Sequence, residues 1–481
     1  GYSESHGCSG GGALLVTAND TRDLTWDTRT NNAVVENLIL ENSHSKNGGG
    51  LSLFRVDGPT VKNLIVRNNT ATMMGGGINV YSSVFSMEDV EIHDNLCYGT
   101  VYGGFNDVGH GGGLFLNQTW GTLDNMDIHH NTASMNGGGV WSSEGSAWTM
   151  TNSNVSDNVA PYNGGGFGFW NHNEQDLNAT LVNVTIANNV AQQGWFIGHG
   201  GGVWANNSST VFEDCRFINN VSNDNGGAVN YWGGSSSPKF YHTTFDGNTS
   251  TSFGGAIYIA PDAGSFHVEY CTFVNNSTGI NGAGIQTNRS GAVINSTFYG
   301  NSAGEYGAIS IGDYYYVDVY NSILWNEDVN DIELGGLVGY FNVFHSDIRP
   351  SSDDNYNSYW EGNGNIDVDP RFNGTDAGDF TLREDSPCKD AGIADLDGDG
   401  VEDITDYNGS APDMGAFESQ MSAPSDFLLL ASTNYVVATW LETEEESFQY
   451  YLLERSTDPE FNEDVVSNFL LKLGRHFYEH L

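Results

Sequence analysis

Positive charge is scarce in this sequence. The chain of 481 residues has 16 lysine and arginine residues against 61 aspartate and glutamate residues, and its formal net charge is -45 at pH 7. We therefore exclude nucleic acid as a natural partner, because phosphate binding needs clustered cations. The same shortage disfavours docking on an anionic membrane surface. No run of 18 apolar residues occurs, so we also expect no membrane insertion.

Cysteine and proline are sparse as well, with 5 and 10 residues. Glycine and proline together make up about 15% of the chain, which excludes a low-complexity linker. Cys215 and Cys271 take the same phase in copies of a repeat that lie two units apart. Their separation of about 9–10 Å would exceed the reach of a disulfide. We expect buried thiols acting as small apolar groups, and the cysteine count leaves the redox compartment open.

The start of the chain and its composition favour an extracellular or cell-surface protein. The sequence opens at Gly1 without a methionine or a signal segment, which indicates either a removed signal or a mature fragment. High acidity keeps a protein hydrated and dispersed in salty water. Asn-x-Ser/Thr tripeptides, for example at Asn183 and Asn275, permit glycosylation.

Glycine, with 62 residues, is abundant and marks an internal repeat. Glycine pairs or triplets followed by a short alternating apolar segment recur every 24 to 38 residues. These copies begin at Gly10, Gly48, Gly75, Gly111, Gly137, Gly164, Gly200, Gly226, Gly254 and Gly282, with a degenerate copy at Tyr306. A second element precedes most copies: two apolar residues at alternate positions and then an asparagine three residues on, as in Val184-x-Ile186…Asn189.

The repeat predicts an all-β fold, a right-handed parallel β-helix of about eleven coils over residues 1–360. Alternation over four to six residues is typical of short strands with one buried face. Glycine at a constant phase supplies the positive φ of a tight corner. We expect the recurring asparagine to stack from coil to coil as an amide ladder. The spacing of coils gives a rod about 50 Å long.

Parts of the repeat resemble the half-motifs of polymorphic outer-membrane-type adhesins. Phe217-Ile-Asn-Asn220 and Phe273-Val-Asn-Asn276 resemble the FxxN half-motif, and Gly226-Gly-Ala-Val229 resembles the GGA[ILV] half-motif. The segment from Asp369 to Glu418 resembles the closing segment of secreted right-handed β-helix proteins. This resemblance covers about residues 8–419 and implies the pectate-lyase-like β-helix superfamily. That superfamily contains adhesins and surface proteins as well as polysaccharide lyases and hydrolases.

Two further regions follow the repeats. Residues 361–419 form the closing segment, and the pattern changes again over residues 420–481. There, Tyr435-Val-Val-Ala-Thr-Trp440 and Tyr450-Tyr-Leu-Leu-Glu-Arg-Ser456 resemble the first strands of a fibronectin type III domain. We expect a partial, β-sandwich-like unit, because such a sandwich needs about 100 residues. The end, Phe469 to Leu481, has the pattern of a helix.

The closing segment contains an acidic loop that predicts a structural Ca²⁺ site. Its carboxylates and one backbone carbonyl fall at positions 1, 3, 5, 7, 9 and 12 of a twelve-residue loop, with Gly400 at position 6. Such spacing wraps the oxygen ligands that a hard cation prefers. The predicted ligands are Asp395, Asp397, Asp399, Val401, Asp403 and Asp406. The alternative is a solvated acidic turn.

A polar patch is predicted on the outside of two consecutive coils. Glu91 and Asp127 take equal phases in these coils, and so do His93 and His129. If the intervening isoleucines point inward, all four side chains lie on one outer patch with neighbours about 5 Å apart. Such a patch could hold a transition metal or perform acid–base chemistry. The alternative is the ordinary wet face of a strand.

Aromatic residues recur just after the glycines, at positions that the alternation places outward. They are Phe115, Trp141, Trp204 and Tyr258, with Trp170 and Trp232 two residues further along. Exposed aromatic rings provide stacking surfaces for sugar rings or for a partner protein. A phase error of one residue would instead place them in the core. A binding face and a packing role are both open.

Two coils are longer than the others and add loops to one side of the rod. Residues 96–110 and 190–199 are insertions before the glycines, and they end in Gly109-His110 and Gly198-His199. They start three coils apart, so we expect both to project from the same side. Functional residues of solenoids are often found on such loops, although they can also be mere surface decoration.

These observations favour an extracellular structural or adhesive protein over an enzyme. Between Arg67 and Arg216 there is no lysine or arginine, so the middle coils cannot supply the cationic base that uronate elimination often uses. We expect a rigid, acidic solenoid that binds a glycan or a protein on a surface, or self-associates into a fibre or larger assembly. The alternative is a glycoside hydrolase or a calcium-assisted lyase acting beside the two insertions.

Overall fold

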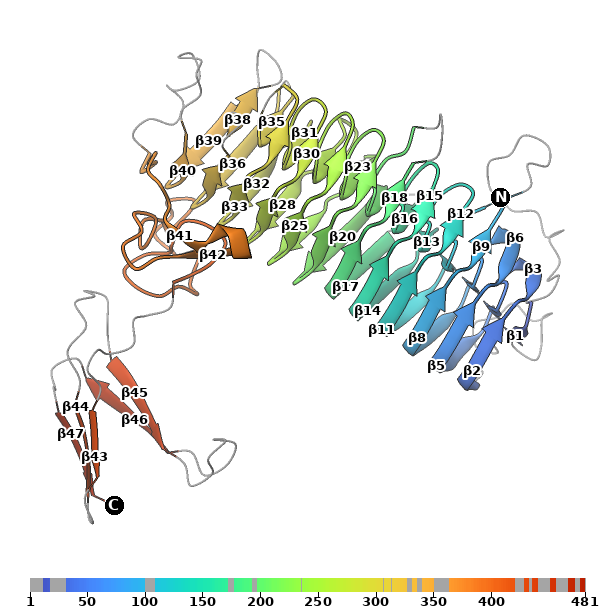
Figure 1. The fold of residues 1–481 in the computed structure, drawn as a ribbon, viewed down its shortest axis with the longest axis horizontal. Coiled ribbons are helices and arrows are strands. Elements are labelled where there is room, and N and C mark those ends of the chain that lie inside the picture. Colours follow the sequence, from blue (N-terminus) through green and yellow to red (C-terminus); the bar gives the residue numbers. More distant parts are fainter. Residues whose placement is uncertain are drawn as a thin grey trace. The chain divides into compact units, whose positions relative to one another are not determined.

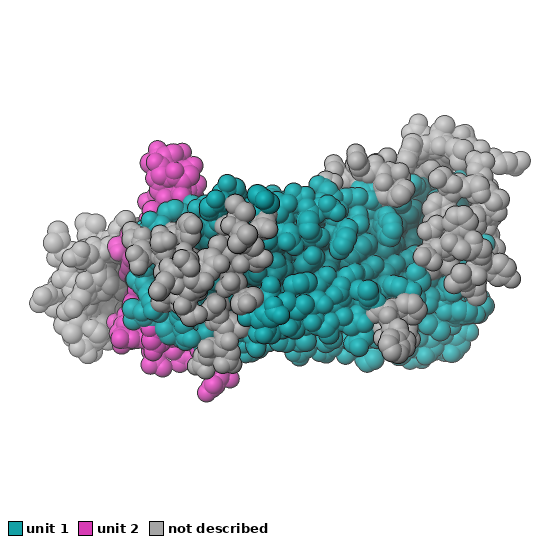
Figure 2. Space-filling view, turned by 90° about the horizontal axis from the view of Figure 1, so that it is seen from above, with its two compact units in different colours: residues 1–368 teal, residues 369–481 magenta. Residues whose placement is uncertain are grey.

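The structure is a computed structural model of the chain. It describes residues 12–17, 32–99, 109–171, 177–192, 197–234, 236–305, 307–312, 314–326, 331–334, 340–349 and 363–419, and five strands beyond residue 427. The contacts divide the chain into two compact units, Gly1–Val368 and Asp369–Leu481, which Figure 2 colours separately. The predicted boundary between residues 360 and 361 falls outside the described residues.

The first unit is a parallel β-solenoid with three sheets along its length (Figure 1). Sheet A follows the glycine corners and contains β1 (Leu14–Thr17), β4 (Leu51–Phe54), β7 (Ile78–Tyr81), β10 (Leu114–Asn117), β13 (Val140–Ser143), β16 (Phe167–Trp170), β19 (Val203–Asn206), β23 (Val229–Trp232), β27 (Ile257–Ile259), β31 (Ile285–Thr287), β35 (Ile309–Ile311) and β38 (Ile332–Leu334). Sheet C precedes the corners and contains β3 (His44–Asn47), β6 (Thr70–Met74), β9 (Leu96–Cys97), β12 (Thr132–Ala133), β15 (Val159–Ala160), β18 (Val190–Ala191), β22 (Val221–Ser222), β26 (Thr249–Ser250), β30 (Ser277–Thr278) and β34 (Ser302–Ala303). Sheet C has ten strands, one in each of ten turns, which is close to the predicted number of about eleven coils.

Sheet B has the longest strands. It starts with β2 (Val34–Glu41), β5 (Asp57–Arg67), β8 (Val84–His93), β11 (Trp120–His129), β14 (Ala147–Ser156) and β17 (Leu177–Ala187). Later turns supply two shorter strands each: β20 (Ser208–Glu213) and β21 (Arg216–Ile218), β24 (Lys239–Tyr241) and β25 (Thr244–Asp246), β28 (Phe266–Glu269) and β29 (Thr272–Val274), β32 (Gly291–Ile294) and β33 (Thr297–Tyr299), β36 (Tyr316–Tyr320) and β37 (Ile323–Trp325), β39 (Tyr340–Phe344) and β40 (Asp347–Ile348). A residue with positive φ bends this sheet in every turn, for example Asn152 at φ 50 and Asp214 at φ 52. Asparagine and aspartate tolerate this conformation better than other side chains.

The glycine corners lie directly above one another, as the repeat predicts. The Gly138 amide donates to the Gly164 carbonyl at 3.0 Å, and Val140 pairs in register with Phe167. Gly137 has φ +64, a conformation that side chains disfavour. A Cβ atom on Gly138 would lie 2.4 Å from the Gly165 carbonyl oxygen, so the close approach of neighbouring backbones also requires glycine.

A ladder of buried asparagines follows the corner between sheets B and C, which confirms the predicted amide stack. From Asn95 to Asn326, each Oδ1 atom accepts from the backbone amide and the Nδ2 atom of the asparagine in the preceding turn, at 2.9–3.1 Å. The members are Asn69, Asn95, Asn131, Asn158, Asn189, Asn220, Asn248, Asn276, Asn301 and Asn326. Asp331 ends the ladder, since its Oδ1 atom accepts from both nitrogens of Asn326.

The core between the sheets is aliphatic at the start of the rod and aromatic further along. The phenylalanines of the FxxN copies stack in one column, with ring centroids 4.9 Å apart for Phe217 and Phe245 and 4.4 Å apart for Phe273 and Phe298. Cys215 and Cys271 lie in the core as free thiols, in agreement with the sequence prediction. Burial raises the pKa of both thiols to about 12, which keeps them protonated and inert.

The second unit contains short elements only. Strands β41 (Phe372–Gly374) and β42 (Asp379–Leu382) flank a 3₁₀ helix, Thr375–Ala377. Antiparallel strands follow: β43 (Leu428–Ala431), β44 (Tyr435–Thr439), β45 (Tyr450–Arg455), β46 (Val466–Leu471) and β47 (His476–His480). The expected helix from Phe469 to Leu481 is therefore wrong, because β46 pairs with β45 and β47 pairs with β44. Within the described residues, no helix has the length and apolar character needed to cross a membrane.

Candidate functional site

The strands of sheet A carry no formal charge along most of the rod. The strands from β1 to β35 contain no aspartate, glutamate, lysine, arginine or histidine, and Glu333 in β38 is the first charged residue. Alternate residues of each strand, such as Leu116 and Phe169, point into the core. The remaining positions carry mainly amide, hydroxyl and aromatic side chains. These uncharged strands contrast with those of sheet B, which contain charged residues such as Glu91 and Asp127.

The four aromatic residues predicted to form an exposed face are buried. Phe115, Trp141, Trp204 and Tyr258 have exposed fractions of 2, 4, 5 and 9%. The first three form a cluster of their own, separate from the main core. The predicted direction of these three side chains is therefore supported, but the prediction that the four rings are free to stack against a ligand is wrong. A packing role, which the sequence also allowed, describes them better.

Two features outside the aromatic pattern explain the burial of Trp141. Gly168 lies between Trp141 and Trp204 in the sheet register, and a Cβ atom on it would lie 2.3 Å from Cε3 of Trp141. The missing side chain lets the Trp141 indole extend over this turn, where its centroid lies 6.2 Å from that of Trp204. The ring of His110, which lies in the corner before sheet A, stacks on Trp141 with ring centroids 4.6 Å apart.

Exposed aromatic rings lie at the ends of two other strands of sheet A, β16 and β23. Trp170 and Trp232 are each 39% exposed. Both pair in register with Asn206, so they occupy one column along the outer face of sheet A. Phe54 and Tyr81 occupy equivalent strand positions near the start of the rod, and their rings stack at 5.4 Å. The sequence pattern pointed to this column, because both tryptophans lie two residues after Gly168 and Asn230, which pair in register with Trp204.

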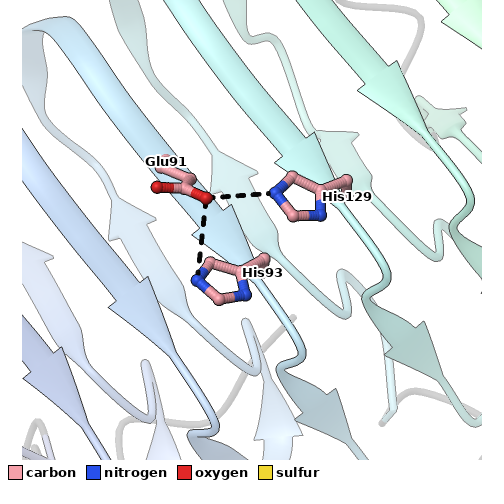
Figure 3. A group of neighbouring side chains, drawn as sticks. All are labelled: Glu91, His93 and His129. Carbon is pink, nitrogen blue, oxygen red and sulfur yellow. Dashed lines mark hydrogen bonds and ion pairs between the residues drawn. The ribbon is translucent and has the colours of Figure 1, made fainter.

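The predicted polar patch comes together on the outer face of sheet B. Glu91 pairs in register with Asp127, and His93 pairs with His129. The Oε1 atom of Glu91 lies 3.3 Å from Nε2 of His129 and 3.8 Å from Nε2 of His93, as Figure 3 shows. Asp127 lies beside them, with Oδ2 3.8 Å from Nε2 of His129. The two imidazole rings stack almost parallel, with centroids 5.0 Å apart.

The acidic loop of the closing segment places three of its predicted ligands together. Carboxylate oxygens of Asp395, Asp397 and Asp403 lie within 4.8 Å of one another. Asp399 is outside this group, and its Oδ1 atom accepts from the Val401 amide at 2.8 Å. Asp406 is also outside the group. The loop is wrapped around Asp395, whose carboxylate accepts from the amides of Gly398 and Gly400 at 2.8 Å.

The two insertions leave the solenoid from the same corner. β9 and β18 both belong to sheet C and lie three turns apart, so both insertions precede a glycine corner on one side. Their middles, residues 100–108 and 193–196, fall outside the described residues. His199 at the end of the second insertion lies 3.2 Å from Asp224. Burial lowers the pKa of His199, and the Asp224 charge opposes that shift.

A comparison with protein-family models agrees with the fold. The family model described as "Right handed beta helix region" matches residues 112–303, which include the turns from β10 to β34. The crystal structure of pectate lyase Pel9A aligns with 78% of this chain and 89% of its own, at 15% sequence identity and a TM-score of 0.32. No curated protein matches the chain. The chain is thus an all-β parallel solenoid with a right-handed β-helix region.

Proposed function

We propose that this protein is an extracellular or cell-surface structural or adhesive protein whose outer face of sheet A binds a neutral glycan. The observation that carries the proposal is the absence of charged residues within the strands β1 to β35 of that sheet. Trp170 and Trp232 supply exposed rings there, and sugar rings stack on such surfaces. Amide groups between them, such as Asn206, offer donors and acceptors for sugar hydroxyls.

The same face is poorly equipped for turnover. Hydrolysis of a glycosidic bond needs a pair of carboxyl groups beside the sugar, and elimination needs a base with a neutralising cation. The strands of this face supply neither group. A polyanionic glycan would also be repelled by a net charge of -45. A neutral ligand that is held and not cleaved fits both facts.

The remainder of the rod supports a structural role. The asparagine ladder and the parallel sheets join each turn to its neighbours, so this face is held in a fixed geometry over ten turns. A Ca²⁺ ion in the loop of Asp395, Asp397 and Asp403 would cross-link carboxylates that otherwise repel one another. This ion would stabilise the closing segment without taking part in binding.

A polysaccharide panel tests the proposal on the full chain. Binding is measured by depletion from solution with neutral polysaccharides (cellulose, xylan, mannan) and with polygalacturonate as the acidic member. We expect retention on at least one neutral polymer, and a loss of affinity of about tenfold in the double variant Trp170→Ala/Trp232→Ala. Trp120→Ala is the matched control, because Trp120 is 38% exposed but belongs to β11 of sheet B.

Two results would contradict the proposal. Release of reducing ends or unsaturated products would show a polysaccharide-active enzyme, the alternative that the insertions suggest. Binding that the double variant leaves intact would place the ligand elsewhere, and concentration-dependent self-association without glycan binding would favour an assembly of copies of the chain.

A further inference from the structure

The patch on sheet B has the composition and spacing of a metal site. Nε2 of His93, Nε2 of His129 and a carboxylate oxygen of Glu91 all lie within 4.8 Å of one another. In a tetrahedral zinc site, bonds of about 2.0–2.1 Å place ligand atoms about 3.3 Å apart. The distance from Glu91 Oε1 to His129 Nε2 is 3.3 Å, and the distance to His93 Nε2 is 3.8 Å. Small side-chain rotations would bring all three atoms to bonding distance.

A second layer of contacts orients both imidazoles. The Nδ1 atom of His93 lies 2.7 Å from Oδ2 of Asp94, and the Nδ1 atom of His129 lies 2.9 Å from Nδ1 of His130. Both rings therefore turn their Nε2 atoms toward Glu91 and use Nδ1 for a partner on the other side. Histidines that bind metals commonly have such a second-layer partner, which fixes the ring and its tautomer.

The hydrogen bond of His93 leaves a lone pair on its Nε2 atom for a metal. A carboxylate only accepts, so the Nδ1–H group of His93 donates to Asp94 and the Nε2 atom of the neutral ring is unprotonated. The Nε2 atom of His129 lies 3.3 Å from Oε1 of Glu91, which only accepts, so without a metal Nε2–H donates to Glu91 and Nδ1 accepts from Nδ1–H of His130; a metal ion would displace that Nε2 proton. These tautomers follow from the contacts. Neutral imidazoles and a carboxylate are ligands that zinc, copper and nickel ions prefer.

A histidine–glutamate pair elsewhere on sheet B shows how an ordinary surface pair differs from this patch. His267 and Glu269 form a single pair at 2.8 Å in β28, without a second histidine. That arrangement is an ordinary surface pair. In the patch, the His93 and His129 side chains are only 15% and 21% exposed while Glu91 is 40% exposed, so an ion can enter from solvent on the carboxylate side.

We propose that Glu91, His93 and His129 bind a zinc-type transition-metal ion on the outer face of sheet B. Asp127 or water completes the coordination, since Oδ2 of Asp127 lies 3.8 Å from Nε2 of His129. Asp94 and His130 are positioning residues that act through His93 and His129. The site is separate from the oxygen-only loop around Asp395, which suits a hard cation.

The test is titration of the full chain with ZnCl₂ by calorimetry, with excess CaCl₂ present to occupy oxygen-only sites. We expect one zinc ion per chain and, with CoCl₂, the intense visible absorption of a tetrahedral nitrogen-ligated site. His93→Ala and His129→Ala should each lower the zinc affinity at least about 100-fold. Asp94→Asn should lower it about 10–100-fold, because it loses the charged second-layer partner. His267→Ala is the matched control and should bind zinc as the unmodified protein does.

Each of the other outcomes would overturn the proposal. Zinc binding that is unchanged in His129→Ala places the ion elsewhere, and no zinc binding in the presence of CaCl₂ shows an ordinary polar patch. Equal loss in His267→Ala indicates general histidine binding. Circular dichroism of each variant verifies that the solenoid is folded, so lost affinity cannot be assigned to unfolding.

Discussion

Replacing Asn220 by alanine removes one step from the middle of the asparagine ladder. The Asn220 side chain makes four hydrogen bonds: Oδ1 accepts from the amide and Nδ2 of Asn189 at 3.1 Å, and Nδ2 donates to Asn248 Oδ1 at 3.0 Å and to the Ile186 carbonyl at 2.8 Å. At about 1 kcal/mol for each bond, the loss is about 4 kcal/mol. The buried Asn189 amide also loses its acceptor, which adds to this cost unless water enters.

Hydrogen exchange and denaturation measure the effect together. A solenoid can unfold in parts, so a single unfolding transition is not assured. We expect amide exchange in β18 and β22 and in the neighbouring turns to accelerate about 10²–10³-fold, which corresponds to about 3–4 kcal/mol. The urea midpoint should fall as well. Exchange in β2 and β5, several turns away, should change little.

The control is Asn342→Ala. The Asn342 side chain is exposed and donates to Asp318 at 2.7 Å, so its loss should cost less than about 1 kcal/mol. If Asn220→Ala and Asn342→Ala have equal effects, the ladder does not stabilise the rod and the reasoning fails. A large but uniform increase in exchange over all turns would also refute it, because the loss should be local.

Three further predictions follow from other contacts. Burial raises the pKa of Asp331 to about 7 from an ordinary 3.8, so the stability that this carboxyl group contributes is complete below about pH 4 and is lost as the pH rises through 7. Amide exchange near β37 should rise over this window, because the free energy of unfolding falls by at most about 1.4 kcal/mol per pH unit. Asp331→Asn should remove this pH dependence. Removal of Ca²⁺ by a chelator should lower the melting temperature of the closing segment, and Asp397→Ala should abolish that response; an unchanged melting temperature in both cases would remove the calcium site. Gly138→Ala should destabilise the rod by more than about 2 kcal/mol in urea denaturation, because its Cβ would clash with the Gly165 carbonyl. The control variant Gly234→Ala should be tolerated, because its Cβ would meet Asp262 at 3.7 Å. Equal urea midpoints for the two variants would show that the corners relax.

The sequence predicted the structure correctly where the same residue types recur at the same position of every turn. The register of the turns follows from glycine and asparagine at constant phase, so the pairing of His93 with His129 could be predicted from spacing alone. Alternation within a strand also gave the correct side of the sheet for Trp141 and Trp204, which form a cluster separate from the main core.

It failed where contacts cross from one element to another. The burial of Trp141 depends on Gly168 in the next turn and on His110 in the preceding corner, and neither is visible in the periodicity of its own strand. The end of the ladder at Asp331 was missed for the same reason, because an aspartate replaces the repeated asparagine outside the repeat. In the last strands, local pattern favoured a helix, whereas pairing with earlier strands decided the structure.

The repetition of the ladder makes the length of this protein an adjustable quantity. The backbone amide and side chain of Asn248 bond to Asn276 as those of Asn220 bond to Asn248, so removal of the segment from Thr249 to Asn276 would rejoin matching surfaces. The shortened protein would keep its cross-section and lose about 4.8 Å of reach. Duplication of whole turns would lengthen it by the same step, so the length of the rod can change in fixed increments.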